Sequence, residues 1–260
     1  MKRYWYIWFT MTKRITQVAF ASRLGVIFFT LGKLIRFLLF LFFLLLIMQN
    51  TKADAGFTTW QIILFFITFN IVDVLSQFLL REVYRFREYV VSGNFDHILL
   101  KPISPLFRSL FGGSDILDFV TLIPLVGFLV FTVTKLDPVS ILQIIFYVLL
   151  LCNSLIIAIS LHIFVLALGV ITTEVDNAVW LIRDITQLGR VPVDIYKSTM
   201  RTLLTFVLPV AALVTIPTKA LLGIVSIEGV LLAVVFSAVL LTLSLLSWQY
   251  ALKQYASASS

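Results

Sequence analysis

Four titratable side chains lie in or beside apolar stretches, where acid–base chemistry on a lipid would need them: Asp73, His97, Asp115 and Asp118. Such a membrane-embedded enzyme normally places clustered His or Glu residues beside its carboxylates. The two histidines, His97 and His162, are far apart in the sequence, so neither that cluster nor a histidine metal pair is expected. The residue types therefore favour a chain without catalytic groups of its own, with the lipid enzyme kept as an alternative.

The carboxylates have structural interpretations as well. Asp115 and Asp118 are three residues apart. They could form a carboxylate pair or act as charges that stabilise the N-terminus of a helix, and the second interpretation is expected. Asp73 is more unusual, because an ionised carboxylate within a membrane span is costly unless it is paired. It is a structural partner of Lys33 or Arg36, a residue close to the cytoplasmic end of the span, or a contact for a proton or substrate.

Other signatures of chemistry are missing from the sequence. No G-x-x-x-x-G-K-[ST] run occurs, so the chain carries no phosphate-binding loop of that kind. The single cysteine, Cys152, lies in an apolar run, which excludes a disulfide framework and a thiolate metal site. The net charge of +7 is assigned to membrane topology and not to nucleic acid, because basic residues collect in cytoplasmic loops.

The apolar content predicts an all-α polytopic integral membrane protein forming one domain, residues 1–260. Hydrophobic residues make up 60% of the chain and charged residues 13%, against roughly 25% charged in globular proteins. Residues 37–48 contain no polar side chain. About six spans are expected, at 26–49, 60–80, 116–134, 141–171, 203–222 and 230–252. An N-terminal helix, 1–22, is expected to lie in the interface with Trp5, Trp8, Phe9, Ile15 and Val18 sharing a side.

The fifth span is the ambiguous one, because Pro209 and Pro217 interrupt it. Residues 203–222 form either a full span, which the hydropathy favours, or a half-membrane hairpin. In the second case 175–190 would belong to the fifth span and 191–217 would face outside. With a full span and both termini in the cytoplasm, 17 of the 20 Lys and Arg residues are cytoplasmic; the hairpin moves Arg190, Lys197 and Arg201 across.

The largest polar stretch, residues 81–108, follows the second span. Residues 81–91 are expected to continue that span as an amphipathic helix, and Gly93-Asn94 permits a turn. Phe95–Leu100 is then expected to be a short helix along the membrane surface, ended by Pro102. Such an element is either a docking surface for a partner protein or an ordinary loop.

Four runs, which make up two patterns, resemble a known family. Residues 93–102, GNFDHILLKP, are similar to the G-x-h-D-x-h-L-h-[RK]-P signature (h, hydrophobic) of ABC-2-type permeases, the membrane subunits of bacterial ATP-binding-cassette exporters. VPVDIY at 191–196, LLTFVLPV at 203–210 and IPTKALLG at 216–223 resemble the family's second pattern. Val191 and Thr218 depart from the usual aromatic residue and Ala.

The resemblance implies a non-enzymatic permease subunit in the bacterial inner membrane, with residues 81–108 as the element that couples it to a separate ATPase. That subunit would bind ATP and Mg, and this chain would bind no cofactor. A second permease, identical or a paralogue, and membrane lipids would be the other partners, without nucleic acid. The residues assigned to ATPase coupling are Arg85, Arg87, Glu88, Phe95, Asp96, Ile98, Leu99 and Lys101. Asp73, Pro209 and Pro217 are candidates for the translocation path or gate, and a scaffold or assembly factor remains an alternative from another class.

Overall fold

The structure is a computed structural model that describes residues 2–50, 56–172 and 175–255. Lys52, which the sequence assigns to an outer loop, lies outside the described residues. All regular elements in the described ranges are helical. In chain order they are α1 (Lys2–Ala21), α2 (Arg23–Asn50), α3 (Thr59–Leu80), η1 (Arg81–Arg85), α4 (Phe86–Val91), α5 (Asn94–Leu99), α6 (Pro105–Phe111), α7 (Ile116–Val133), α8 (Ile141–Thr172), α9 (Val175–Thr186), η2 (Gln187–Arg190), η3 (Val193–Ile195), α10 (Ser198–Thr202), η4 (Leu203–Val207), η5 (Ala211–Thr215), α11 (Ile216–Leu221) and α12 (Ile227–Gln254).

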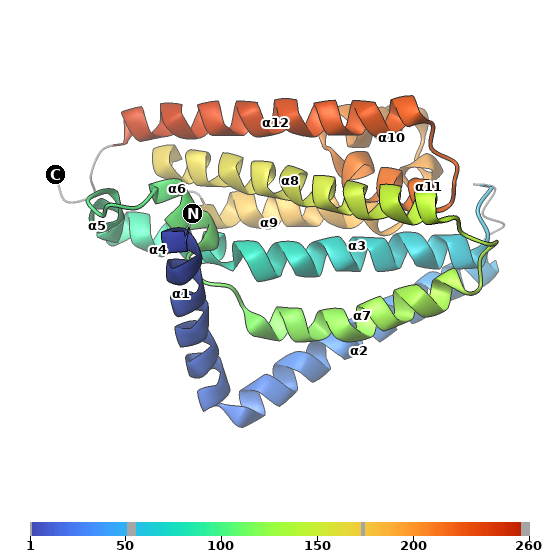
Figure 1. Cartoon of the computed structure of the whole chain (residues 1–260), viewed down its shortest axis with the longest axis horizontal. Coiled ribbons are helices and arrows are strands. Elements are labelled where there is room, and N and C mark those ends of the chain that lie inside the picture. The colour runs from blue at the N-terminus through green and yellow to red at the C-terminus, as the bar shows by residue number, and fades with distance from the viewer. Residues whose placement is uncertain (1, 51–55, 173–174, 256–260) are drawn as a thin grey trace.

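The long helices run side by side along one axis, with the short helices α4 to α6 at one end and α10 and α11 at the other (Figure 1). Within the described residues, five helices are long and apolar enough to cross a membrane: α2, the α3–η1–α4 run, α7, α8 and α12. They cover five of the predicted spans. The all-α, polytopic fold class is confirmed, and α3 continues beyond the apolar run through η1 and α4, as the amphipathic pattern of 81–91 predicts.

Hydrogen bonds from polar side chains join the long helices to one another. The Asn153 side chain of α8 donates to the Ala233 carbonyl of α12 at 3.2 Å, and the Ser237 hydroxyl donates to the Asn153 amide oxygen. In the neighbouring pair, Thr68 of α3 and Tyr147 of α8 share a hydrogen bond of 3.1 Å. Such bonds between spans stabilise helix association where lipid provides no hydrophobic drive.

The expected fifth span at 203–222 is bent in the structure, which is compatible with a broken span or with a re-entrant hairpin. Residues Ser198–Val207 and Ala211–Leu221 form two arms that meet at an angle of 79°. Pro209 lies at the break and has no N–H to donate, so the helical ladder cannot continue through it. Leu208 instead donates to the Leu203 carbonyl at 2.9 Å, closing a π-type turn. We call residues 198–221 the bent pair.

The segment before the bent pair runs along the bundle. The α9 helix starts at the end where α8 finishes and runs back beside it, and η2 continues it toward the bent pair (Figure 1). Gly189 of η2 packs against Val210 and Val214, where an added Cβ would come within 3.0 Å and 3.2 Å of their side chains. The hairpin alternative would use this segment, 175–190, for the fifth crossing.

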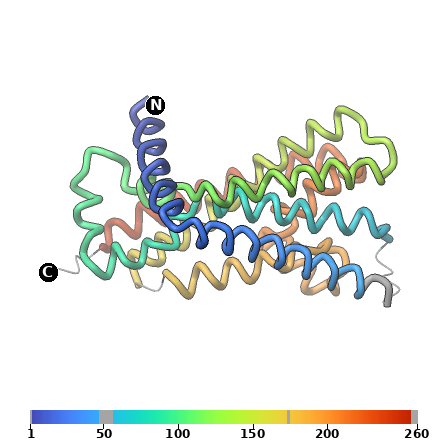
Figure 2. The backbone as a smooth tube through the Cα atoms, turned by 90° about the horizontal axis from the view of Figure 1, so that it is seen from below, coloured from blue at the N-terminus to red at the C-terminus, as the bar shows by residue number. Residues whose placement is uncertain are grey.

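The α1 helix lies across the bundle and not along it, as Figures 1 and 2 both show. Trp8 and Ile15 pack against the loop before α7, whereas Trp5, Phe9 and Val18 are exposed. The apolar side expected of the N-terminal helix is therefore divided. Its inner residues hold the helix against the loop before α7, and its outer aromatic rings suit the headgroup region of a membrane.

Candidate functional site

The short helices α4, α5 and α6 lie together at the end of the bundle that holds the C-terminal ends of α3, α8 and α12 (Figure 1). We call residues 81–111 the end segment. Gly93 has a φ of +73°, a conformation that glycine adopts without strain, and it reverses the chain between α4 and α5. Ser104 then caps α6 by accepting a hydrogen bond from the Phe107 N–H at 3.3 Å.

Phe95 of α5 is the anchor of the end segment. Its side chain is 0% exposed and packs edge-on against Phe86, Trp248 and Tyr255, with ring centroids 5.1, 6.3 and 5.2 Å away. The next residue adds a polar contact, because the Tyr255 hydroxyl donates to the Asp96 carboxylate at 2.9 Å. Partial burial and this bond raise the pKa of Tyr255 to about 12. The first residues of α5 are thus tied to the end of α12.

These contacts correct part of the sequence assignment. Phe95 and Ile98 belong to the buried core of the chain, so their side chains do not present a surface to a partner. The open face of α5 and the turn after it consists of Asn94, His97, Leu100 and Lys101, with Asp96 and Leu99 half-buried at its edges. Leu100, at 82%, has the highest exposed fraction among the large apolar side chains of the described residues.

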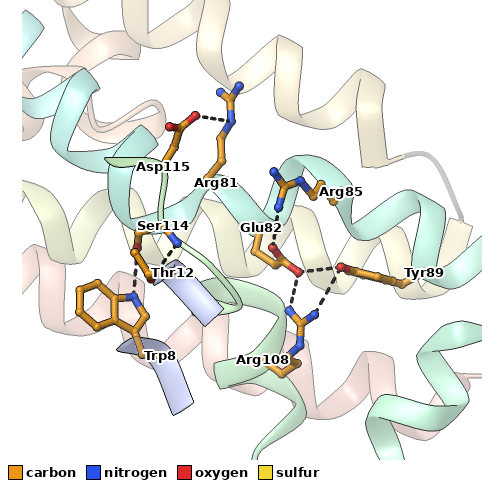
Figure 3. A network of polar contacts seen from close by, with 9 residues as sticks. All are labelled: Trp8, Thr12, Arg81, Glu82, Arg85, Tyr89, Arg108, Ser114 and Asp115. Carbon is orange, nitrogen blue, oxygen red and sulfur yellow. Dashed lines mark hydrogen bonds and ion pairs between the residues drawn. The ribbon is translucent and has the colours of Figure 1, made fainter. Parts of the chain in front are cut away.

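Glu82 stands at the centre of a buried polar network (Figure 3). Its side chain is 2% exposed and accepts hydrogen bonds from Arg108, from Tyr89 at 2.7 Å and from Arg85 at 3.4 Å. Burial alone would lower the pKa of Arg108, but the Glu82 carboxylate outweighs that effect and raises it above its ordinary value. The ion pair fixes α6 against the start of the end segment.

The network uses residues that the sequence analysis did not assign to the site. The sequence does not single out Glu82, Tyr89 and Arg108 as site residues, because nothing in the spacing of 26 residues between Glu82 and Arg108 indicates a pair. Of the assigned charges, Arg85 belongs to the network. Arg87 instead pairs with Asp176 of α9 at 3.5 Å, and Glu88 is exposed.

The N-terminal helix is attached beside this network (Figure 3). The Trp8 indole N–H donates to the Ser114 hydroxyl at 3.0 Å, and the Ser114 N–H donates to the Thr12 hydroxyl at 3.2 Å. Farther along the end segment, the rings of Tyr4 and Phe107 meet edge-on at 4.7 Å. Helix α1 and the end segment therefore form one connected unit.

The proposed acid–base set does not form a catalytic cluster. Asp115 caps α7 by accepting from the Leu117 N–H at 3.1 Å, and Asp118 pairs with Lys33, which confirms their assignment to a helix N-terminus. His97 is exposed on α5. No group of three or more metal-binding side chains occurs in the described parts of the chain.

Asp73 lies on a cavity between α2, α3, α7 and the α9–η2 segment, with a volume of about 360 Å³. Its carboxylate accepts a hydrogen bond from Gln77 at 2.7 Å. Lys33, the expected structural partner of Asp73, pairs with Asp118 instead. Pro209 marks the break of the bent pair, and Pro217 is buried in the first turn of α11.

The architecture is that of a multi-pass membrane protein built around a rigid unit at one end. Comparison with protein families gives a match to the ABC-2 family transporter proteins over residues 34–259. The chain belongs to that family. Comparisons with curated proteins and with solved structures give no match.

Proposed function

We propose that this chain is the permease subunit of an ATP-driven exporter, coupled through its end segment to a separate ATPase subunit. The chain itself is not an enzyme in this proposal, and ATP and Mg are bound by the partner. A second permease subunit, identical or a paralogue, completes the path in the bacterial inner membrane, with both termini of this chain in the cytoplasm.

The observation that carries the proposal is the two-sided character of α5. Its inner face is fixed by Phe95 among Phe86 and Trp248, whereas its outer face presents Leu100 and Lys101 to the surroundings. In this proposal the exposed Leu100 and Lys101 contact the partner subunit. Movement of α5 would be passed to α4 and α12 by close-packed rings, since packed interiors transmit strain.

The Glu82 network gives the end segment the stiffness that such coupling needs. A push on α5 would otherwise be absorbed by the loop between α5 and α6. Because Arg108 binds Glu82 at the end of α3, and Trp8 and Thr12 bind Ser114, the end segment moves with α1 and α3 as one body. Transport would then follow from tilting of the spans and not from chemistry on this chain.

The experiment is a pull-down of the tagged full-length chain from its native membrane, with identification of bound proteins and an assay of ATPase activity. The wild-type chain is expected to recover an ATPase, and Lys101→Glu and Leu100→Asp are expected to lose it. Lys135→Glu is the matched control, because Lys135 is an exposed lysine in the loop between α7 and α8, far from α5 along the bundle (Figure 1).

Recovery of an ATPase with wild type and the control, and its loss with both α5 variants, would support the coupling role. A preparation that contains no ATPase would favour the scaffold or assembly factor. An ATPase retained equally by all variants would show that α5 is not the docking element.

A further inference from the structure

The cavity beside Asp73 has an excess of positive charge. Four basic side chains and one carboxylate line it: Lys33, Arg36, Arg183, Arg190 and Asp73. Lys33 already pairs with Asp118, outside the lining, and Arg183 stacks on Trp180. Within the described ranges, Arg36, Arg183 and Arg190 make no ion pair with a carboxylate.

Arg36 and Arg190 lie beside the middle of α2, where Arg36 is exposed and Arg190 is half-buried. Arg36 is 13 residues from the start of α2 at Arg23, which corresponds to roughly 20 Å along the helix axis. Arg190 stacks on Phe40 at 4.0 Å and on Phe69 at 5.2 Å, both near the middle of their helices. Its Nε atom is buried and has no hydrogen-bond partner. A buried cationic atom without a partner is costly unless an opposite charge accompanies it, so an anion in the cavity would be favourable.

The remaining lining is mostly hydrocarbon. Phe37 and Phe40 of α2 face Phe66 of α3 and Phe128 of α7, and Asn70 and Gln77 add amide groups near Asp73. Guanidinium groups bind phosphate through two parallel hydrogen bonds, and a lysine offers only a point charge. A ligand that satisfies both parts of this lining has a phosphate group at one end and an apolar body.

We propose that this cavity is a binding site for a phosphate-bearing amphiphile. Its phosphate lies between Arg36 and Arg190, and its hydrocarbon follows the Phe37 and Phe128 side of the cavity. The volume of about 360 Å³ accommodates a headgroup and the first part of a chain, as in small-molecule sites of this size. The inference does not depend on coupling to an ATPase.

The test is a lipid titration of the purified full-length chain, followed by native mass spectrometry. Dioleoyl phosphatidic acid supplies the phosphate monoester, dioleoyl phosphatidylcholine the zwitterionic comparison and inorganic phosphate the anion without a tail. The double variant Arg36→Gln/Arg190→Gln is expected to weaken phosphatidic acid binding at least about tenfold. That lower limit corresponds to the loss of a single charge-assisted contact. Lys135→Gln, which removes one charge away from the cavity, is expected to bind as the wild type does.

Preference for phosphatidic acid over phosphatidylcholine, with loss only in the double variant, would support the site. Equal binding of the two lipids, or unchanged binding by the double variant, would overturn it. Displacement of the lipid by an equal concentration of inorganic phosphate would also overturn it, since the tail would then contribute nothing.

A second measurement needs no substitution and so is independent of folding of the variant. Wild-type chain is irradiated with phosphatidic acid that carries a diazirine on its acyl chain, and the cross-linked peptides are mapped. Cross-links are expected at the cavity-lining Phe37, Leu41, Leu125 and Phe128, and not at the outward-facing Leu39 and Ile123 of the same helices. Cross-links confined to the exposed faces of α8 and α12 would show an ordinary lipid coat and overturn the proposal.

Discussion

The ring of Phe95 meets the ring of Trp248 edge-on, with centroids 6.3 Å apart and planes at 76°. The contact joins a helix of six residues outside the spans to α12, a helix of 28 residues that runs along the bundle. Edge-to-face aromatic pairs of this kind contribute beyond their buried area. Phe95 therefore holds the end segment to the last span, and the first prediction concerns its removal.

Replacing Phe95 with Ala is expected to lower the free energy of unfolding by about 3 kcal/mol or more, because a fully buried ring is lost and a cavity remains. The measurement is SDS titration of the purified chain in mixed micelles. Phe42→Ala is the control, since Phe42 is 61% exposed on α2 and its loss opens no internal cavity. Equal effects of the two substitutions would contradict the anchoring role of Phe95.

The Glu82–Arg108 ion pair predicts strong non-additivity. Glu82→Gln alone leaves Arg108 as a buried charge without its carboxylate and is expected to cost about 3–5 kcal/mol. The double variant Glu82→Gln/Arg108→Met is expected to cost less than the sum of the two single variants, by about 1–3 kcal/mol. A double-mutant cycle of unfolding free energies measures this difference, and additivity within about 0.5 kcal/mol would refute a direct pair.

Gly112 follows α6 and has an ordinary helical backbone, so only space limits a side chain there. A Cβ would lie 2.7 Å from the Glu82 carboxyl carbon and would also collide with Arg108. Gly112→Ala is expected to destabilise the chain by about 1–3 kcal/mol by pushing Arg108 away from Glu82. Gly127→Ala on α7, where no atom lies within 4 Å of the added Cβ, is expected to be neutral or stabilising. Thermal unfolding of both variants distinguishes crowding from a general glycine effect.

The Tyr255–Asp96 contact predicts a late phenol titration. Because the folded-state pKa of Tyr255 is raised to about 12, the contact stabilises the fold below the ordinary tyrosine pKa of about 10 and is lost as the pH rises through about 12. The difference in phenolate absorbance between wild type and Tyr255→Phe is therefore expected to stay small up to about pH 11. A full phenolate difference already near pH 10 would mean that the hydrogen bond is absent.

The bent pair predicts the sidedness of its flanking residues. In a Cys152→Ser background, His97→Cys and Lys197→Cys are expected to react with a membrane-impermeant maleimide from opposite sides, because they lie at opposite ends of the bundle. Lys135→Cys is the control and is expected to react from the same side as Lys197→Cys. Labelling of residues 97 and 197 from the same side would show that 203–222 is a full span.

The five long spans could be predicted because lipid imposes a minimum apolar length on each. The expected 26–49 and 230–252 begin three residues inside the observed α2 and α12, which start at Arg23 and Ile227. The hydropathy of a segment, however, does not record the direction in which its helices run. Two apolar arms bent by 79° at Pro209 give the same average as one straight helix.

The position of the short helix α5 could be predicted from the sequence, but its contacts could not. A short helix at Phe95–Leu100 follows from its apolar residues and the proline that ends it, and α5 is observed at Asn94–Leu99. Which face of such a helix is covered by the chain itself depends on Trp248, more than 150 residues away. Likewise, the Lys33–Asp118 pair joins residues 85 apart, and no local pattern distinguishes it from the Lys33–Asp73 pair that was considered.

Helix α8 has 32 residues and is therefore roughly 48 Å long, well beyond the hydrocarbon thickness of about 30 Å. Near one end Gly169 packs close to Val175 and Phe86, and near the other Gln143 packs against Gly223 after the bent pair. A rod of this length works as a lever: a tilt of about 5° displaces one end relative to the other by roughly 4 Å. A small displacement beside α4 can thus reach the bent pair without any residue inside α8 changing its conformation.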